Sequence, residues 1–180
     1  MPGADTISIR KADSNELELL YATCRQCYSE NFADQWESGG LEYYLDLVYG
    51  LEPIRSDLSN PNINYFLAII NDEPIGFLKL HLNSNLPNHP LDEGMEIEKI
   101  YFLRKHKGKG FGKQLIKVAL DMANQLDKKI IWLTALDSNI SSIAFYQKLG
   151  FKYHSPTRVD FPYFKDELRG MWRMLLDLKS

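Results

Sequence analysis

A short turn rich in glycine and lysine is the part of the sequence that points most directly to chemistry. Residues 107–113 read Lys-Gly-Lys-Gly-Phe-Gly-Lys and lie between an alternating polar and apolar stretch and a stretch with helical periodicity. Glycines let a backbone approach a ligand closely, and the first N–H groups of a helix have no partner inside the helix. Together with the charge of the lysines, the turn predicts a binding site for an anion such as a phosphate.

Two common phosphate-binding patterns do not fit this turn. A P-loop requires glycine, four further residues and then Gly-Lys-Ser/Thr, and neither serine nor threonine follows the lysine here. The dinucleotide fingerprint requires Gly-x-Gly-x-x-Gly, whereas the chain has Gly-x-Gly-x-Gly. Both Mg-nucleotide and dinucleotide chemistry are therefore disfavoured.

The hydrophobic pattern predicts the elements that position this turn. Residues 95–102 alternate as a strand does, and Leu115, Val118, Met122 and Leu126 then form one helical face. Helices are also predicted from a capping box at Asp13 to about residue 30, over about 41–48 and over 139–149. Further strands are predicted over 6–11, 63–70, 74–82, 130–136, from 151 and over 170–178. Residues 51–62, with two prolines, and 155–167 are predicted to be loops.

A second motif, later in the chain, indicates which kind of anion the turn binds. The turn resembles the acyl-CoA pyrophosphate loop of the GNAT acetyltransferases, Gln/Arg-x-x-Gly-x-Gly/Ala, with Lys107 in place of Gln or Arg and with Gly110 and Gly112 on the two glycines. Residues 139–151 resemble the family's Asn-x-x-Ala-x-x-x-Tyr…Gly-Phe segment, with Ser142 in place of Ala. The resemblance implies an α/β fold with a mixed sheet of about seven strands and about four helices. We expect a single domain over residues 1–180.

The resemblance also implies roles for particular residues in binding acetyl-CoA. The pyrophosphate would be bound by Lys107, Gly108, Lys109, Gly110, Phe111, Gly112 and Lys113, and the pantetheine arm would pair with the backbone of Ile100, Tyr101 and Phe102. Asn139 matches a position that contacts the cofactor. Tyr146 matches the general acid, and a phenol with a reference pKa near ~10 suits protonation of a thiolate whose acid titrates near ~8.5.

Two glutamates are the candidates for handling the amine. Glu96 and Glu98 are two residues apart in a predicted strand, so both should face the same side. Either could take the proton of the amine, directly or through water, or hold the ammonium in place. Glu98 matches the acidic residue of the polyamine acetyltransferases and Glu96 the base of the histone-type members; we favour Glu98, and the two could share the role.

The acceptor is predicted less directly. The strand resembles that of the bacterial spermidine/spermine-type branch, Glu-x-Glu-x-Ile-Tyr, and residues 13–57 carry ten acids against Arg25 and Arg55. Acids and aromatic side chains such as Trp36 and Tyr44 suit a polyamine. The alternatives are a protein N-terminus, an amino acid or an aminoglycoside-like amine. A homodimer is one option for the assembly.

Composition and charge bear on the other classes of function. Net charge is −3 and 44% of residues are hydrophobic, without an apolar run of membrane-spanning length or a signal peptide, so we expect a cytoplasmic protein that contacts no membrane. Residues 99–117 hold eight basic residues and no acid, but nucleic-acid binding would not explain the glycines or Tyr146. A catalytically inactive acyl-CoA sensor is a further alternative. Cys24 and Cys27 lie on an apolar helical face, and no metal is expected.

Overall fold

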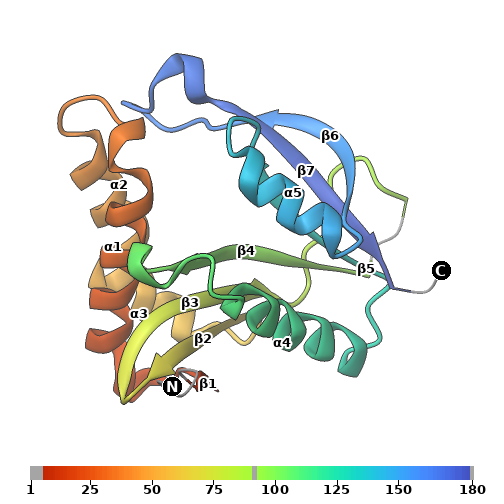
Figure 1. Ribbon diagram of the computed structural model, residues 1–180, viewed down its shortest axis with the longest axis horizontal. Helices are drawn as coiled ribbons and strands as arrows, with labels where there is room; N and C mark the ends of the chain where they lie inside the picture. Colours follow the sequence, from red (N-terminus) through yellow and green to blue (C-terminus); the bar gives the residue numbers. More distant parts are fainter. Residues whose placement is uncertain (1–5, 91–92, 179–180) are drawn as a thin grey trace.

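The chain forms one mixed β-sheet covered by helices on both faces (Figure 1). The computed structural model describes residues 6–90 and 93–178. The strands are β1 (Ser8–Lys11), β2 (Ile63–Ile70), β3 (Glu73–His81), β4 (Gly94–Phe102), β5 (Ile130–Leu136), β6 (Lys152–Arg158) and β7 (Gly170–Asp177). The α-helices are α1 (Leu17–Phe32), α2 (Gly40–Tyr49), α3 (Leu51–Ser59), α4 (Phe111–Gln125) and α5 (Ile140–Lys148). The sheet order is β1-β2-β3-β4-β5-β7-β6, which confirms the predicted mixed α/β architecture.

Local signals in the sequence define the first half of the sheet. The hairpin between β2 and β3 turns at Asn71 and Asp72, whose φ angles of 50° and 63° are those of a type I′ turn. The capping box at Asp13 is present and precedes a 3-10 turn, Ser14–Glu16, that leads into α1. Both features follow from short-range sequence chemistry, and the capping box and the two strands of the hairpin were predicted.

The prediction of a loop over residues 51–62 is wrong, because residues 51–59 form α3. Pro53 is the third residue of that helix, and the N–H groups of the first turn have no intrahelical partner, so a proline costs little there. Ile54, the next residue, is completely buried. Burial of one helical face therefore outweighs the proline signal, and α3 is one helix more than expected.

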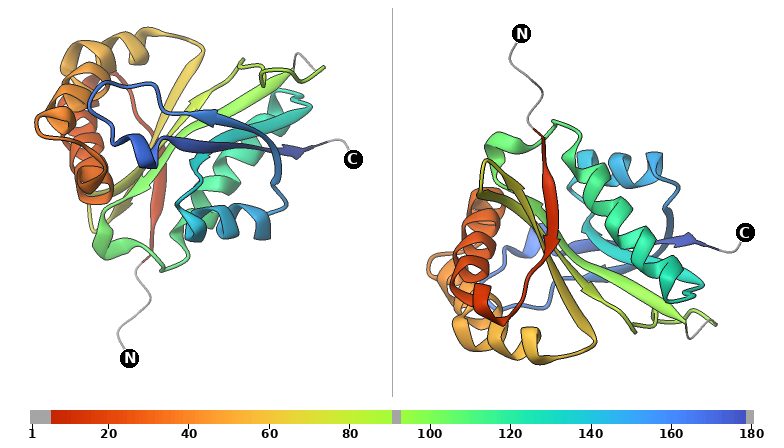
Figure 2. Two further views of the ribbon diagram at one scale, coloured as in Figure 1. Left: turned by 90° about the horizontal axis from the view of Figure 1, so that it is seen from above. Right: turned by 90° about the horizontal axis from the view of Figure 1, so that it is seen from below.

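Two hydrophobic cores lie on opposite faces of the sheet. In both views of Figure 2, α1, α2 and α3 lie on one side of the sheet and α4 and α5 on the other. Side chains that alternate along β2 and β3 supply both cores: Leu67 and Phe77 pack beneath α1 to α3, and Ala68 and Leu78 pack beneath α4. The prediction that a Cys24 and Cys27 pair is buried on α1 holds, since both thiols are free and fully buried.

Two details of the predicted elements differ from the structure. On α4 the most buried residues are Leu115, Ile116, Ala119 and Ala123, so the core face is rotated from the predicted one and Leu126 is exposed. Strand β6 extends to Arg158, although the sequence predicts irregular structure from residue 155. Within residues 6–90 and 93–178, none of the helices combines the length and apolar character that crossing a bilayer needs.

The sheet opens where β4 and β5 separate, and this opening forms the functional region. The two strands pair in parallel from Gly94↔Ile130 to Ile97↔Leu133, and no described pairing continues beyond that point. Strand β4 meanwhile stays paired with β3 as far as Gly76↔Phe102. A β-bulge shifts the β3–β4 register between Lys79↔Lys99 and Leu80↔Ile97, which leaves Glu98 as the extra residue. The second half of β4 therefore has a free edge.

Candidate functional site

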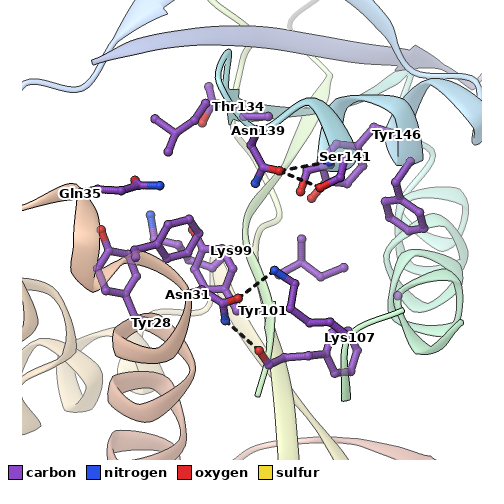
Figure 3. Close-up of a pocket in the computed structure, with 18 of the residues that line it drawn as sticks. Tyr28, Asn31, Gln35, Lys99, Tyr101, Lys107, Thr134, Asn139, Ser141 and Tyr146 are labelled. Carbon is purple, nitrogen blue, oxygen red and sulfur yellow. Dashed lines mark hydrogen bonds between the residues drawn. The ribbon is translucent and has the colours of Figure 1, made fainter. Parts of the chain in front are cut away.

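A cavity of about 840 Å³ lies at the opening between β4 and β5. Its walls come from α1, α2 and the segment between them, the ends of β4 and β5, the turn before α4, helix α5, and the end of β6 with the segment after it (Figure 3). Eleven predicted site residues line it: Ile100, Tyr101, Phe102, Lys107, Gly108, Gly110, Phe111, Gly112, Lys113, Asn139 and Tyr146. Lys109, Glu96 and Glu98 are not among the described residues that line it.

The glycine turn has the geometry of an anion site. Gly108 and Gly110 have φ angles of +76° and +84°, a backbone conformation that side-chain-bearing residues rarely adopt. Helix α4 begins directly after Gly110, and no described side chain caps its N-terminus. The first N–H groups of α4 therefore remain able to bind an anion, and Lys107 and Lys113 line the same wall.

The third glycine of the turn is required for a different reason. A Cβ on Gly112 would lie 3.1 Å from the ring of Phe145 on α5, closer than side-chain carbons normally pack. Gly112 thus lets the start of α4 approach α5. Because α5 carries Asn139 and Tyr146, this contact holds the two motifs at the same cavity.

A hydrogen-bonded link joins α1 to the glycine turn. The amide nitrogen of Asn31 donates to the carbonyl oxygens of Cys27 at 2.7 Å and Phe102 at 2.8 Å. Its amide oxygen accepts from Lys107 Nζ at 2.9 Å (Figure 3). The neighbouring Glu30 accepts from the backbone N–H of Arg104 at 2.7 Å. The sequence analysis missed this link, because the partners are more than 70 residues apart and no local pattern connects them.

Helix α5 places its two predicted residues toward the cavity. Asn139 is the N-cap of α5, and its side-chain oxygen accepts from the backbone N–H of Ser142 at 3.2 Å and from the Ser141 hydroxyl at 3.1 Å. The amide nitrogen of Asn139 faces the cavity (Figure 3). Tyr146 is 8% exposed, and burial, with a smaller effect of Tyr101, raises its pKa well above that of an ordinary phenol. Its hydroxyl therefore stays protonated.

The two predicted glutamates lie on the α1–α3 face of β4 and do not line the cavity. Glu98 contacts three basic side chains: Lys79 at 2.8 Å, His81 at 2.5 Å and Lys99 at 3.3 Å. Burial alone would raise the pKa of Glu98, but these basic neighbours outweigh it and hold the pKa well below the usual range. Lys79 also contacts Asp57 at 2.7 Å, so the two lysines of the cluster are matched by two carboxylates.

Glu96 is in a different environment from Glu98. It is paired across the sheet with His81, whose ring contacts Glu98, so the two glutamates share a face as predicted. Burial raises the pKa of Glu96, although the Ser84 hydroxyl donates to its carboxylate at 2.9 Å. Of the two carboxylates, Glu96 is therefore the better proton acceptor near neutral pH.

Lys99 connects the glutamate cluster to the cavity. Its ammonium contacts Glu98, while the residue itself lines the cavity beside Tyr44 and Tyr101. Burial lowers the pKa of Lys99, but the opposite effects of Tyr44 and Glu98 are larger. The net result is a pKa well above the ordinary lysine value. A protonated lysine thus lies on the cavity wall, a feature that the sequence analysis did not assign to the site.

An aromatic group forms the remaining wall. The ring of Tyr44 stacks on Tyr28 with centroids 4.5 Å apart and contacts Trp36 and Phe161, each at 4.9 Å. Trp36 and Tyr44 line the cavity as the sequence suggested. The acids that were expected beside them do not line the cavity. Glu42 and Asp46 form ion pairs with Arg25, and Glu52 forms one with Arg55. Among the described residues, no group of three or more potential metal ligands occurs.

Comparisons with known proteins agree with this geometry. The family model "Acetyltransferase (GNAT) family" matches residues 21–151. The spermidine N(1)-acetyltransferase of Thermoplasma acidophilum is 25% identical over 163 residues, 87% of this chain and 94% of that protein. The aminoalkylphosphonate N-acetyltransferase of Salmonella typhimurium is 32% identical over 115 residues, 62% of this chain and 71% of that protein.

A solved structure shows the same fold. The crystal structure of the PaiA N-acetyltransferase from Thermoplasma acidophilum, in complex with coenzyme A, superposes with a TM-score of 0.75 and 21% identity, covering 96% of this chain and 99% of that one. The family model spans well over half of the chain and includes the glycine turn and Tyr146. The chain belongs to the acetyltransferase (GNAT) family.

Proposed function

We propose that the protein transfers the acetyl group of acetyl-CoA to the primary amine of a small acceptor, by direct attack of the amine on the thioester. The observation that carries the proposal is the shared cavity, which joins an uncapped helix N-terminus and its glycine turn to the phenol of Tyr146. An uncapped N-terminus suits the pyrophosphate of CoA. A protonated phenol suits the leaving thiolate. Both groups line one continuous space.

The free edge of β4 supports a place for the reacting end of acetyl-CoA. Residues 100–102 line the cavity and lack a described partner on the β5 side. Their backbone groups are therefore available to pair with the extended pantetheine arm, and an N–H there would bind the thioester oxygen as negative charge develops on it. Asn139, across the cavity, would donate from its amide nitrogen to the same arm.

The acetyl transfer can be written with its protons. The neutral amine nitrogen attacks the thioester carbonyl carbon, the carbon–sulfur bond breaks, and the departing thiolate takes the proton of the Tyr146 hydroxyl. The amine gives up one proton as the amide forms. Glu98, with its lowered pKa, is a weak base and suits electrostatic positioning through Lys99, whereas Glu96 suits proton acceptance through water. In this proposal Glu96, and not the expected Glu98, is therefore the general base.

A polyamine is the acceptor that the sequence favours, and a relative of similar length is a spermidine acetyltransferase. Its support within the cavity is limited to aromatic faces, which attract ammonium groups by about 0.5–2 kcal/mol each. Against it stands the Lys99 ammonium, because two like charges ~6 Å apart repel by roughly 3 kcal/mol at an effective dielectric constant of about 20. The relative that acts on aminoalkylphosphonates points to another kind of amine.

A comparison of two tyrosine variants tests the proposal. Free thiol release from acetyl-CoA would be measured with a panel of primary amines for the parent, Tyr146→Phe and Tyr153→Phe. Tyr153 is 49% exposed on β6 and does not line the cavity, so it is the matched control. We expect Tyr146→Phe to lower kcat about 100-fold with acetyl-CoA affinity nearly unchanged. Equal turnover by the parent and Tyr146→Phe would contradict the assigned role.

A further inference from the structure

The charged side chains that line the cavity are all basic. The lining includes four lysine or arginine residues, Lys99, Lys107, Lys113 and Arg158, and none of the described lining residues is aspartate or glutamate. Lys107 and Lys113 belong to the glycine turn and are accounted for by the pyrophosphate. Lys99 and Arg158 lie elsewhere, one on β4 and the other at the end of β6, so a CoA phosphate at the turn does not explain them.

Arg158 is an unpaired cation at the cavity. It is the last residue of β6 and is exposed, and its backbone pairs with Gly170. Among the described residues, every other arginine of the chain has an ion pair or hydrogen bond, as the set Arg10, Arg25, Arg55, Arg104, Arg169 and Arg173 shows. Arg158 has none in the same part of the chain, so its guanidinium is available to a ligand.

Lys99 is the second cation, and it lies deeper. Only 17% of its side chain is exposed, and it contacts Glu98, which does not line the cavity and belongs to the cluster that Lys79 and Asp57 complete. Lys99 itself lines the cavity, as Tyr44 and Tyr101 do, so a ligand that reaches this part of the cavity meets its side chain (Figure 3). A buried ammonium with one contact at 3.3 Å can still donate to a further acceptor.

A neutral acceptor atom completes the set. The side-chain oxygen of Gln35 is buried and has no hydrogen-bond partner among the described residues, and Gln35 lines the cavity opposite β4 (Figure 3). A buried oxygen of this kind needs a donor. The N–H groups of a bound amine would supply one. The cavity thus offers cations for an anion and an acceptor for an amine.

We propose that the acceptor is a small amine that also carries an anionic group, a carboxylate or a phosphonate, which Arg158 and Lys99 bind. This inference rests on the proposed acetyl transfer and narrows its acceptor. An amine with one anionic group would be attracted by both cations and bind more tightly. A polyamine would bring two or more positive charges to a wall that holds no described carboxylate. The aromatic wall of Tyr28, Trp36 and Tyr44 then contacts the carbon skeleton between the two polar ends.

Matched acceptors test the inference. The value of kcat/KM would be measured for aminoethylphosphonate, β-alanine, β-alaninamide and diaminopropane, which place different head groups at a similar distance from the amine. Phenylalanine and its amide extend the comparison to a larger body, and spermidine represents the polyamines. Binding of each to the protein saturated with CoA would be followed by titration calorimetry, so that a readout remains that does not depend on turnover.

We expect an anion-bearing amine to exceed its neutral amide about tenfold or more, the usual effect of a hydrogen bond to a charged group. Arg158→Gln should remove most of that preference, and Arg158→Glu should reverse it in favour of diaminopropane or spermidine. Arg55→Gln, an exposed arginine on α3 away from the cavity, is the control and should change nothing. Arg158 is exposed, so its variants should fold, which thermal melting checks.

The outcomes separate this inference from the proposed function. Preference for neutral amines or polyamines by the parent, or an unchanged preference in Arg158→Glu, would overturn the inference while acetyl transfer stands. Arg158-dependent binding of the anion-bearing amines without thiol release would support the inference and contradict the proposed transfer. Weak, equal calorimetric binding of charged and neutral members of each pair would overturn the inference whatever the turnover.

Discussion

Replacing Gly110 with alanine tests the anion site through a single carbon atom. Gly110 is the N-cap of α4 with a φ of +84°, and Gly39 is the N-cap of α2 with a φ of +79°. A Cβ at either position would meet no atom within 4 Å, so neither substitution causes a clash within the protein. The two glycines therefore differ in one respect: Gly110 lines the cavity and Gly39 does not.

The similar backbone conformations of Gly110 and Gly39 set the expected changes in stability and in acetyl-CoA affinity. An L-residue in the left-handed region costs about 1–2 kcal/mol, and for a chain of this length that shifts Tm by roughly 2–8 °C. Gly110→Ala and Gly39→Ala should lose similar stability. Only Gly110→Ala should weaken acetyl-CoA binding, because its methyl group would hold the pyrophosphate away from the N–H groups of α4. A charged hydrogen bond is worth about 1.5–3 kcal/mol, which corresponds to roughly a 10- to 100-fold rise in Kd.

The assay is titration calorimetry with acetyl-CoA for the parent and both variants, with melting temperatures measured in parallel. Equal Kd values for Gly110→Ala and the parent, alongside a lowered Tm, would refute the reasoning, since the backbone strain would then be present without any effect on the ligand. A rise in Kd in both variants would refute it as well, because Gly39 lies outside the cavity.

Further expected results concern the residues around the cavity. Asn31→Ala should raise Kd for acetyl-CoA and lower the free energy of unfolding by about 2–3 kcal/mol, since three hydrogen bonds are lost; Asn15→Ala, on the exposed surface, is the control by calorimetry and denaturant unfolding. Glu98→Gln should destabilise by about 3 kcal/mol at neutral pH. Because the folded pKa of Glu98 is lowered, its contribution is fully present above the ordinary glutamate pKa and is lost progressively as the pH falls from there through the lowered folded pKa. Urea unfolding of the parent and variant at neutral and acidic pH checks this, and a difference that does not narrow in acid would contradict it.

The site residues that the sequence predicted are those set by short-range pattern. Gly110 and Gly112 sit at the head of α4, and Asn139 and Tyr146 sit on one helix, so spacing along the chain translates directly into position. The hairpin at Asn71 and the capping box at Asp13 are local in the same way. Recognition of two motifs at a set distance then defined the fold around them.

What the sequence did not predict depends on contacts between distant segments. Helix α3 packs against β2 and α1 and buries Ile54 completely, and this burial depends on segments outside residues 51–62. The acids of the N-terminal half suggested a cationic acceptor, yet Arg25 and Arg55 bind several of them outside the cavity. Arg158 enters the site from β6, far along the chain, and total charge in a segment says nothing about which side chains face a cavity.

Tracing the acetyl group itself tests the central claim most directly. The purified protein would be incubated with acetyl-CoA carrying an isotopic label in the acetyl group and with the amine panel, and the products would be identified by mass spectrometry. The account predicts that the label appears on the nitrogen of a small amine, in proportion to the thiol released, and that Tyr146→Phe forms it about 100-fold more slowly. Label that stays in acetyl-CoA or appears as free acetate, in protein that binds acetyl-CoA with the predicted dependence on Gly110, would contradict it.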